Sequence, residues 1–96
     1  MHTIVIQEKD IPVIKSSLQL KRNSLEFNIK RYRQQLDKFE EQFNMTSKEF
    51  LKQFKTGNLG DQAQWFEWEY FLEVYEDSLR QVNQINEIKL RGLKNI

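Results

Sequence analysis

The chain has 96 residues, of which 39% are hydrophobic, 12% aromatic and 30% charged, and its net charge is +1. This length fits one domain, the aromatic content argues against disorder, and the near-neutral charge indicates no particular class of partner. The absence of cysteine excludes disulfides, thiolate chemistry and cysteine-ligated zinc. No apolar run approaches the roughly 20 residues of a membrane span, and no signal peptide is recognisable, so we expect a cytoplasmic protein without a membrane partner.

Residues 1–10 are expected to form an N-terminal arm or a short strand. The segment His2–Gln7 is rich in β-branched residues, which favour extended structure. A single strand is not stable without a neighbour, so the segment would pair with another subunit or a partner through Ile4 and Ile6. The alternative is a frayed arm, and the sequence does not decide between the two.

Residues 11–96 are predicted to form one all-α domain, with helices over about 11–43, 47–56 and 62–91. The first helix begins after Asp10, because Pro12 is tolerated in a first turn. Its apolar residues recur at heptad spacing over about 30 residues without a breaker. These residues are Leu18, Leu25, Ile29, Tyr32, Leu36, Phe39 and Phe43, and Arg22 takes the one polar position in the series.

The middle stretch carries start and stop signals for a short second helix. Thr46 and Glu49 form a capping box, in which the Thr46 hydroxyl accepts a hydrogen bond from the Glu49 amide and the Glu49 side chain bonds back. Gly57 supplies a left-handed stop. A turn follows, and Asp61 is expected to cap the third helix.

The third helix has its own heptad series, ending at the polar Asn86. Its apolar members are Trp65, Trp68, Leu72, Tyr75, Leu79 and Val82, and near Asn86 the apolar stripe is expected to drift toward Ile85 and Ile88. We expect an antiparallel helical hairpin of two long helices joined by the short one, with Phe43 level with Trp65. In that register Arg22 and Asn86 fall in one layer, where polar residues would fix the alignment.

Two aromatic residues of the third helix, Phe66 and Tyr70, lie off this series and need another cover. The nearest candidates to cover them lie in and just after the short helix: Phe50, Leu51, Phe54 and Leu59. Any face left exposed favours self-association, since two helices and a short third make a thin core. We therefore expect a homodimer with a four-helix bundle, and the alternative is a monomer with scattered exposed apolar residues.

Charge is distributed unevenly along the chain. Residues 15–38 hold seven basic and two acidic residues, whereas residues 61–77 hold six acidic residues and no basic one. The basic residues Lys21, Lys30, Arg31 and Arg33 of the first helix are candidates for binding an acidic protein or nucleic acid, and a solvated helix face is the simpler interpretation.

The residues needed for catalysis or metal binding are missing. His2 is the only histidine, which argues against a catalytic triad or a histidine base. Glu69, Glu73 and Glu76 share a helix face, but the Glu-x-x-His spacing of di-metal bundles is absent, so we interpret them as a solvated acidic face. We predict no enzyme activity and no catalytic, cofactor-binding or metal-binding residue.

The middle stretch also resembles small α-helical proteins of bacteria and archaea that are treated as antitoxins of toxin–antitoxin operons. The similar positions span residues 43–68, about a third of the chain: Phe43, Met45, Thr46, Glu49, Phe50, Leu51, Phe54, Gly57, Leu59, Gly60, Asp61, Glu67 and Trp68. The resemblance implies a protein that binds and neutralises a cognate toxin, with operator DNA as a second target. A strand followed by one long helix departs from the ribbon-helix-helix pattern of many DNA-binding antitoxins.

These observations predict a non-enzymatic, antitoxin-like protein-interaction module that masks a partner toxin. The candidate partner-binding residues are Ile4, Ile6, Lys21, Lys30, Arg31, Arg33, Phe66 and Tyr70. Residues 80–94 hold four basic residues and one acidic residue, and in a hairpin they lie beside the start of the first helix, so this end is expected to be basic. The alternatives are a nucleic-acid-binding accessory protein, which uses this basic end, and a structural helical subunit.

Overall fold

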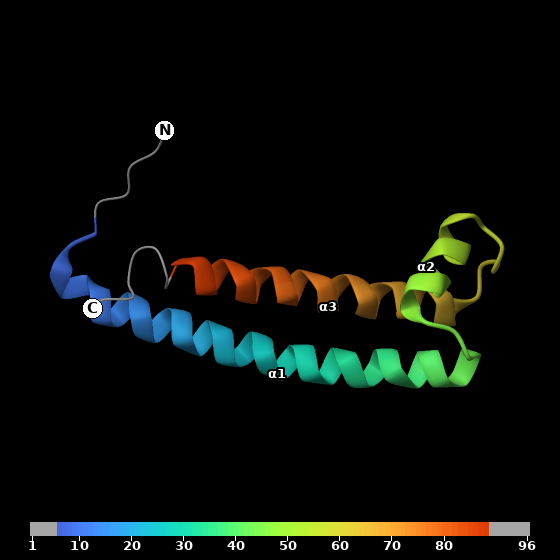
Figure 1. Cartoon of the computed structure of the whole chain (residues 1–96), viewed down its shortest axis with the longest axis horizontal. Coiled ribbons are helices and arrows are strands. Elements are labelled where there is room, and N and C mark those ends of the chain that lie inside the picture. Colours follow the sequence, from blue (N-terminus) through green and yellow to red (C-terminus); the bar gives the residue numbers. More distant parts are fainter. Residues whose placement is uncertain (1–5, 89–96) are drawn as a thin grey trace.

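A computed structural model describes residues 6–88, and its regular structure over that range is entirely helical (Figure 1). The elements are a 3₁₀ turn at Glu8–Asp10 and the helices α1 (Ile11–Phe43), α2 (Ser47–Lys55) and α3 (Ala63–Ile88). The predicted all-α class and the pairing of two long helices are confirmed. The expected strand at His2–Gln7 lies mostly outside the described residues, and its last two positions, Ile6 and Gln7, are not in a strand. The predicted continuation of the third helix to residue 91 also lies outside them.

The long helix α1 is unbroken, as its sequence predicts. Pro12 stands in its first turn, and the Asp10 side chain makes no capping hydrogen bond. The helix ends where Asn44 adopts a left-handed conformation with φ 50°. The Met45 amide then donates to the Glu40 carbonyl at 3.3 Å, which satisfies one of the last free carbonyls of the helix.

The short helix α2 begins and ends at the residues that carry its signals. Thr46 Oγ1 accepts from the Glu49 amide at 3.1 Å, and no return bond from the Thr46 amide to the Glu49 side chain is present among the described residues. Gly57 has φ +78°, and the Gly57 and Asn58 amides donate to the carbonyls of Phe54 and Gln53. This is the Schellman arrangement, for which glycine is the favoured residue.

The start of α3 differs from the expected cap. The helix begins at Ala63, so Asp61 lies in the turn before it rather than directly ahead of its first residue. The Asp61 side chain makes no hydrogen bond within residues 6–88. Instead the Trp65 amide donates to the Gln62 carbonyl at 3.1 Å, and the Gln64 side chain donates to that of Gln62 at 2.8 Å.

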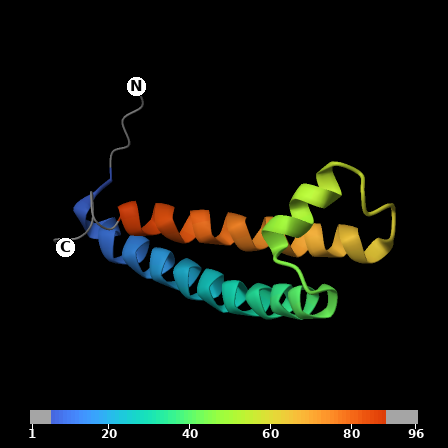
Figure 2. The ribbon, with the colours of Figure 1, turned by 45° about the vertical axis from the view of Figure 1, so that its right-hand side comes forward.

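The three helices form an elongated hairpin of 55 × 29 × 19 Å. The helices α1 and α3 run side by side in opposite directions, and α2 lies across the start of α3 at the closed end (Figures 1 and 2). The predicted register holds at this end. The rings of Phe43 and Trp65 are 4.6 Å apart, and those of Phe39 and Trp68 stack at 5.4 Å.

Farther along, the face that α3 turns toward α1 departs from the heptad series at Leu79, which is 38% exposed, while its neighbour Ser78 is buried. Ile85 is buried, as the predicted drift of the stripe indicates, whereas Ile88 is 46% exposed. Tyr32 contacts Phe71, with 6.3 Å between the ring centres. A nearly straight helix drifts by about 20° per heptad relative to a strict seven-residue repeat, so the contact face moves to neighbouring positions. Burial of Ser78 is tolerated because its hydroxyl donates to the carbonyl one turn earlier, at 2.8 Å.

Candidate partner-binding surface

The closed end of the hairpin is held by one fully buried residue from each helix. Leu36 of α1, Phe50 of α2 and Trp68 of α3 all have an exposed fraction of 0%. The rings of Phe50 and Trp68 are 4.0 Å apart and parallel within 5°. Full burial of such a side chain stabilises the fold by about 1.5–3 kcal/mol. The corner is therefore a rigid support for the residues on its surface.

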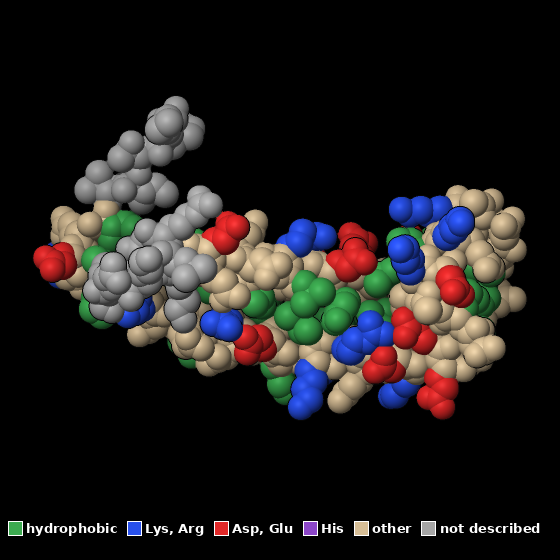
Figure 3. Space-filling model, in the orientation of Figure 1, with side chains coloured by type: hydrophobic (Ala, Val, Ile, Leu, Met, Phe, Trp, Pro, Cys, Tyr) green, Lys and Arg blue, Asp and Glu red, His purple; other side chains and the backbone are tan. Residues whose placement is uncertain are grey.

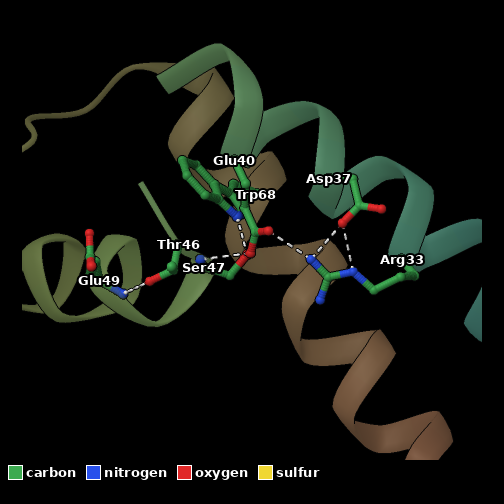
Figure 4. A network of polar contacts seen from close by, with 7 residues as sticks. All are labelled: Arg33, Asp37, Glu40, Thr46, Ser47, Glu49 and Trp68. Carbon is green, nitrogen blue, oxygen red and sulfur yellow. Dashed lines mark hydrogen bonds and ion pairs between the residues drawn. The ribbon is translucent and has the colours of Figure 1, made fainter. Parts of the chain in front are cut away.

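A polar network crosses the same corner and links all three helices (Figure 4). Trp68 Nε1 donates to Ser47 Oγ at 2.9 Å, and the Ser47 amide donates to Glu40 Oε2 at 2.9 Å. The other Glu40 oxygen accepts from Arg33 at 2.8 Å, and Arg33 also bonds Asp37. The bond between Trp68 and Ser47 joins residues 21 apart. Periodicity carried no signal for this network, and sequence reasoning missed Glu40 and Ser47.

The network stabilises the charged forms of Glu40 and Arg33. Partial burial alone would raise the pKa of Glu40, but hydrogen bonds from Ser47 and the positive charge of Arg33 outweigh it and hold that pKa below its ordinary value. Burial alone would lower the pKa of Arg33, but its hydrogen bonds to Asp37, Tyr75 and Glu40 outweigh this effect and raise that pKa above its ordinary value. Both groups are therefore ionised at neutral pH, and Glu40 is a fixed acceptor for α2.

A second indole in the corner has no such partner. Trp65 is 7% exposed, and its Nε1 makes no hydrogen bond within the described part of the chain. Leaving a buried donor unpaired costs about 1–3 kcal/mol. Trp65 packs against Phe43 and Phe50, so its contribution to the corner comes from apolar contact.

Phe66 and Tyr70 stand on the outside of this corner and keep about half of their surface exposed. Phe66 is 51% exposed although Phe54 of α2 meets it edge-on at 5.3 Å. Tyr70 is 56% exposed, and its ring meets that of Phe71 at 5.5 Å. The expected cover by α2 is therefore partial. Two aromatic side chains, one turn apart on α3, therefore remain accessible on the surface.

The surroundings of this pair are acidic. Glu73 and Asp77 follow Tyr70 at helical spacing and are exposed. A groove of about 240 Å³ lies between α2 and α3 beside them, and it is lined by Leu51, Lys55, Glu69, Leu72, Glu73 and Glu76. The three glutamates thus border an apolar floor together with one lysine. No cluster suited to a metal ion occurs among residues 6–88.

The basic candidates of α1 do not form one surface. Lys21 and Lys30 are exposed, and the Arg31 guanidinium lies 5.8 Å from the centre of the Phe27 ring. Arg33 is already engaged by two carboxylates and lies 5.5 Å from the centre of the Tyr75 ring. This inward pairing removes Arg33 from the set of cations free to meet a partner.

The remaining candidates are placed as follows. Ile4 lies outside the described residues, and Ile6 is 46% exposed ahead of the 3₁₀ turn. Arg22 pairs with Glu26 on its own helix at 2.9 Å, and no hydrogen bond joins it to the half-buried Asn86 within the described range. The proposed alignment role of Arg22 and Asn86 stays a prediction.

Comparison with known proteins does not place the chain in a family: no family model matches it, and neither does any curated protein or solved structure. Among residues 6–88, no helix combines the length and the apolar content that crossing a bilayer requires. Evidence on function therefore comes from the exposed residues of the closed end of the hairpin.

Proposed function

We propose that this chain is a non-enzymatic protein-interaction module that acts as antitoxins do, by binding a partner protein and masking its working surface. The observation that carries the proposal is the exposed pair Phe66 and Tyr70 on the supported corner. Exposed aromatic residues on a rigid element are the type of side chain that dominates the energy of protein interfaces. A rigid support also lowers the entropy lost on binding.

The charge around the pair specifies the partner's chemistry. Glu73, Asp77 and the groove carboxylates surround the aromatic rings with negative charge. A partner with an apolar pocket and a basic rim would match this pattern and would associate faster at low ionic strength. A nucleic acid would be repelled from this face, because its phosphates carry the same charge.

Three further features belong to the proposal. The resemblance of residues 43–68 to antitoxins supplies the class of partner, a cognate toxin. The protein acts in the cytoplasm, where such a toxin would work. It acts as a homodimer, and the N-terminal arm with Ile4 and Ile6 adds contacts to the partner.

The test uses the protein encoded next to this chain in its native genome. That neighbour, expressed alone, is expected to arrest growth, and co-expression with the wild-type chain is expected to restore it. The variant Phe66→Ser/Tyr70→Ser should fail to restore growth while keeping its helical circular dichroism. The matched variant Asn83→Ser/Gln84→Ser changes two exposed residues of the same helix and should restore growth fully. Full rescue by the aromatic double variant would reject the proposal.

The second candidate is a nucleic-acid-binding accessory protein, favoured by the exposed Lys21, Lys30 and Arg31 of α1. Binding through these cations would weaken steeply with salt, with a slope near −0.9 per phosphate contact on a double-logarithmic plot. Alanine variants of the three residues would flatten that slope by about one unit each. A structural helical subunit, the third possibility, would show neither the growth rescue nor the salt dependence.

A further inference from the structure

The helix α1 has a second apolar stripe that points away from α3, and hydrophobic side chains show at the outer edge of the molecule on the α1 side in Figure 3. Val13, Leu20 and Phe27 recur every seven residues and are 67%, 70% and 63% exposed. Each follows a residue of the inward-facing series by two positions, as Phe27 follows the buried Leu25. Two residues turn a helix by about 200°, so the stripe lies on the face opposite α3.

Small side chains alternate with the large ones along this outer stripe. Ser17 follows Val13 by four residues, and Ser24 follows Leu20 by four, and both serines are exposed. Arg31 follows Phe27 by four residues, so successive positions of the stripe are separated alternately by four and three residues. This is the spacing of residues along a helix-packing interface. A seam of alternating large and small residues presents knobs and gaps to a neighbouring helix. The face is therefore shaped to pack against another helix.

We infer that this outer stripe is the homodimer interface, and that α1 of a second copy packs on it in antiparallel orientation. With the twofold axis between Leu20 and Ser24, Leu20 lies opposite Ser24 of the partner subunit, and Phe27 lies opposite Ser17 of the partner subunit. Leu20 and Phe27 then each fill a gap beside a serine, Val13 lies opposite Arg31 of the partner subunit, and the same contacts occur twice, as a twofold interface requires. The stripe from Val13 to Arg31 is about 27 Å long.

The charges on the rim favour the antiparallel orientation. Exposed Asp10 precedes the stripe, and exposed Arg31 and Lys38 lie at and beyond its other end. The twofold axis places Asp10 level with a position midway between Arg31 and Lys38 of the partner subunit, so opposite charges meet. In a parallel pair each residue would face its own copy, so Arg31 would meet arginine and Lys38 would meet lysine, which is unfavourable. The self-complementary charge pattern identifies a second copy as the occupant.

This interface deepens the homodimer part of the proposed function and is separate from the partner face at Phe66 and Tyr70. Dimerisation through α1 leaves α3 open, so one dimer presents two partner faces. Loss of self-association and loss of partner binding can therefore be measured independently.

The first test is the oligomeric state of the intact chain by sedimentation equilibrium and light scattering from about 1 μM to about 1 mM, a range that brackets dissociation constants of weak and moderate dimers. The wild type should dimerise within this range. Leu20→Glu should raise the dissociation constant by at least about 100-fold, because each dimer would then bury two carboxylates. Gln84→Glu, which places the same carboxylate at an exposed position of α3, should leave it within about twofold of the wild type.

A second variant separates a shaped interface from unspecific hydrophobic association. Ser24→Phe makes the stripe more apolar but fills the gap that accepts Leu20. The proposed packing predicts that this variant dimerises at least about 10-fold more weakly, because overpacking is destabilising. Unspecific association predicts a stronger dimer. Ser24 is exposed in the isolated chain, so the variant is expected to fold.

Orientation is tested by pulsed dipolar spectroscopy on spin-labelled Val13→Cys, since the natural chain contains no cysteine. The antiparallel dimer places the two labelled sites about 27 Å apart along the helix axes, and a parallel dimer places them side by side. A monomeric wild type at about 1 mM, an unaffected Leu20→Glu dimer, a tighter Ser24→Phe dimer or a side-by-side label distance would each overturn the inference.

Discussion

The bond between Ser47 and Trp68 gives the sharpest test of the corner. Ser47→Ala removes the acceptor of an indole N–H on a residue with 0% exposure and leaves that donor buried without a partner. Such an unpaired donor costs about 1–3 kcal/mol. Ser47 is the first residue of α2, so the helix propensities of interior positions give alanine no clear advantage here. We expect a loss of about 1–3 kcal/mol in the free energy of unfolding.

The assay is urea unfolding followed by far-UV circular dichroism, at one protein concentration below dimer formation. Ser16→Ala, an exposed serine in α1, is the control and should change stability by less than about 0.5 kcal/mol. In a Trp68→Phe background the donor is gone, so Ser47→Ala should then cost little. The coupling between the two substitutions should be about 1 kcal/mol or more. Equal losses in both backgrounds would refute the role assigned to this hydrogen bond.

Three further predictions concern the same corner. Trp65→Phe removes a buried donor that has no partner, whereas Trp68→Phe removes one that is hydrogen-bonded to Ser47. In urea unfolding, the loss of stability caused by Trp65→Phe should therefore be smaller than that caused by Trp68→Phe by at least about 1 kcal/mol. Glu40 has a folded-state pKa below its unfolded value, so its stabilising contribution is complete above the unfolded pKa, near about 4.3, and is lost as pH falls through the folded pKa. Thermal unfolding between pH 3 and 7 should therefore show a smaller acid-side loss for Glu40→Gln than for the wild type, and an equal loss would contradict this origin. Gly57→Ala forces a β-carbon into φ +78° and should cost about 1–2 kcal/mol, although nothing lies within 4 Å of the added atom; Gly57→Asn should cost less.

The long helices and the layers at the closed end could be predicted from the sequence. The first helix has no breaker between Pro12 and Asn44, and its apolar residues leave one face to bury. The aromatic residues at heptad spacing then indicate which residues of the two long helices lie opposite each other, and Phe43 packs against Trp65 as expected. The Thr46 cap and the Gly57 stop are local signals, which depend on neighbours in the chain and need no knowledge of the tertiary structure.

The rest could not be predicted, because it depends on how the helices are placed in space. Ser78 is buried in place of Leu79, because the face of α3 that meets α1 shifts gradually away from the strict seven-residue repeat along the helix. The Ser47–Trp68 bond forms only after α2 has folded onto α3. Sequence reasoning missed the outer stripe with Leu20, because its exposure becomes known only when the other face of α1 is seen to pack on α3.

Binding of the partner protein by the exposed aromatic pair on α3 is tested by calorimetric titration of the protein encoded by the neighbouring gene with the wild type and with Phe66→Ser/Tyr70→Ser. We expect saturable binding of the wild type and a loss of at least about 100-fold in affinity for the variant, which corresponds to about 2.7 kcal/mol. Equal affinities for the two chains, at unchanged helical content, would contradict it.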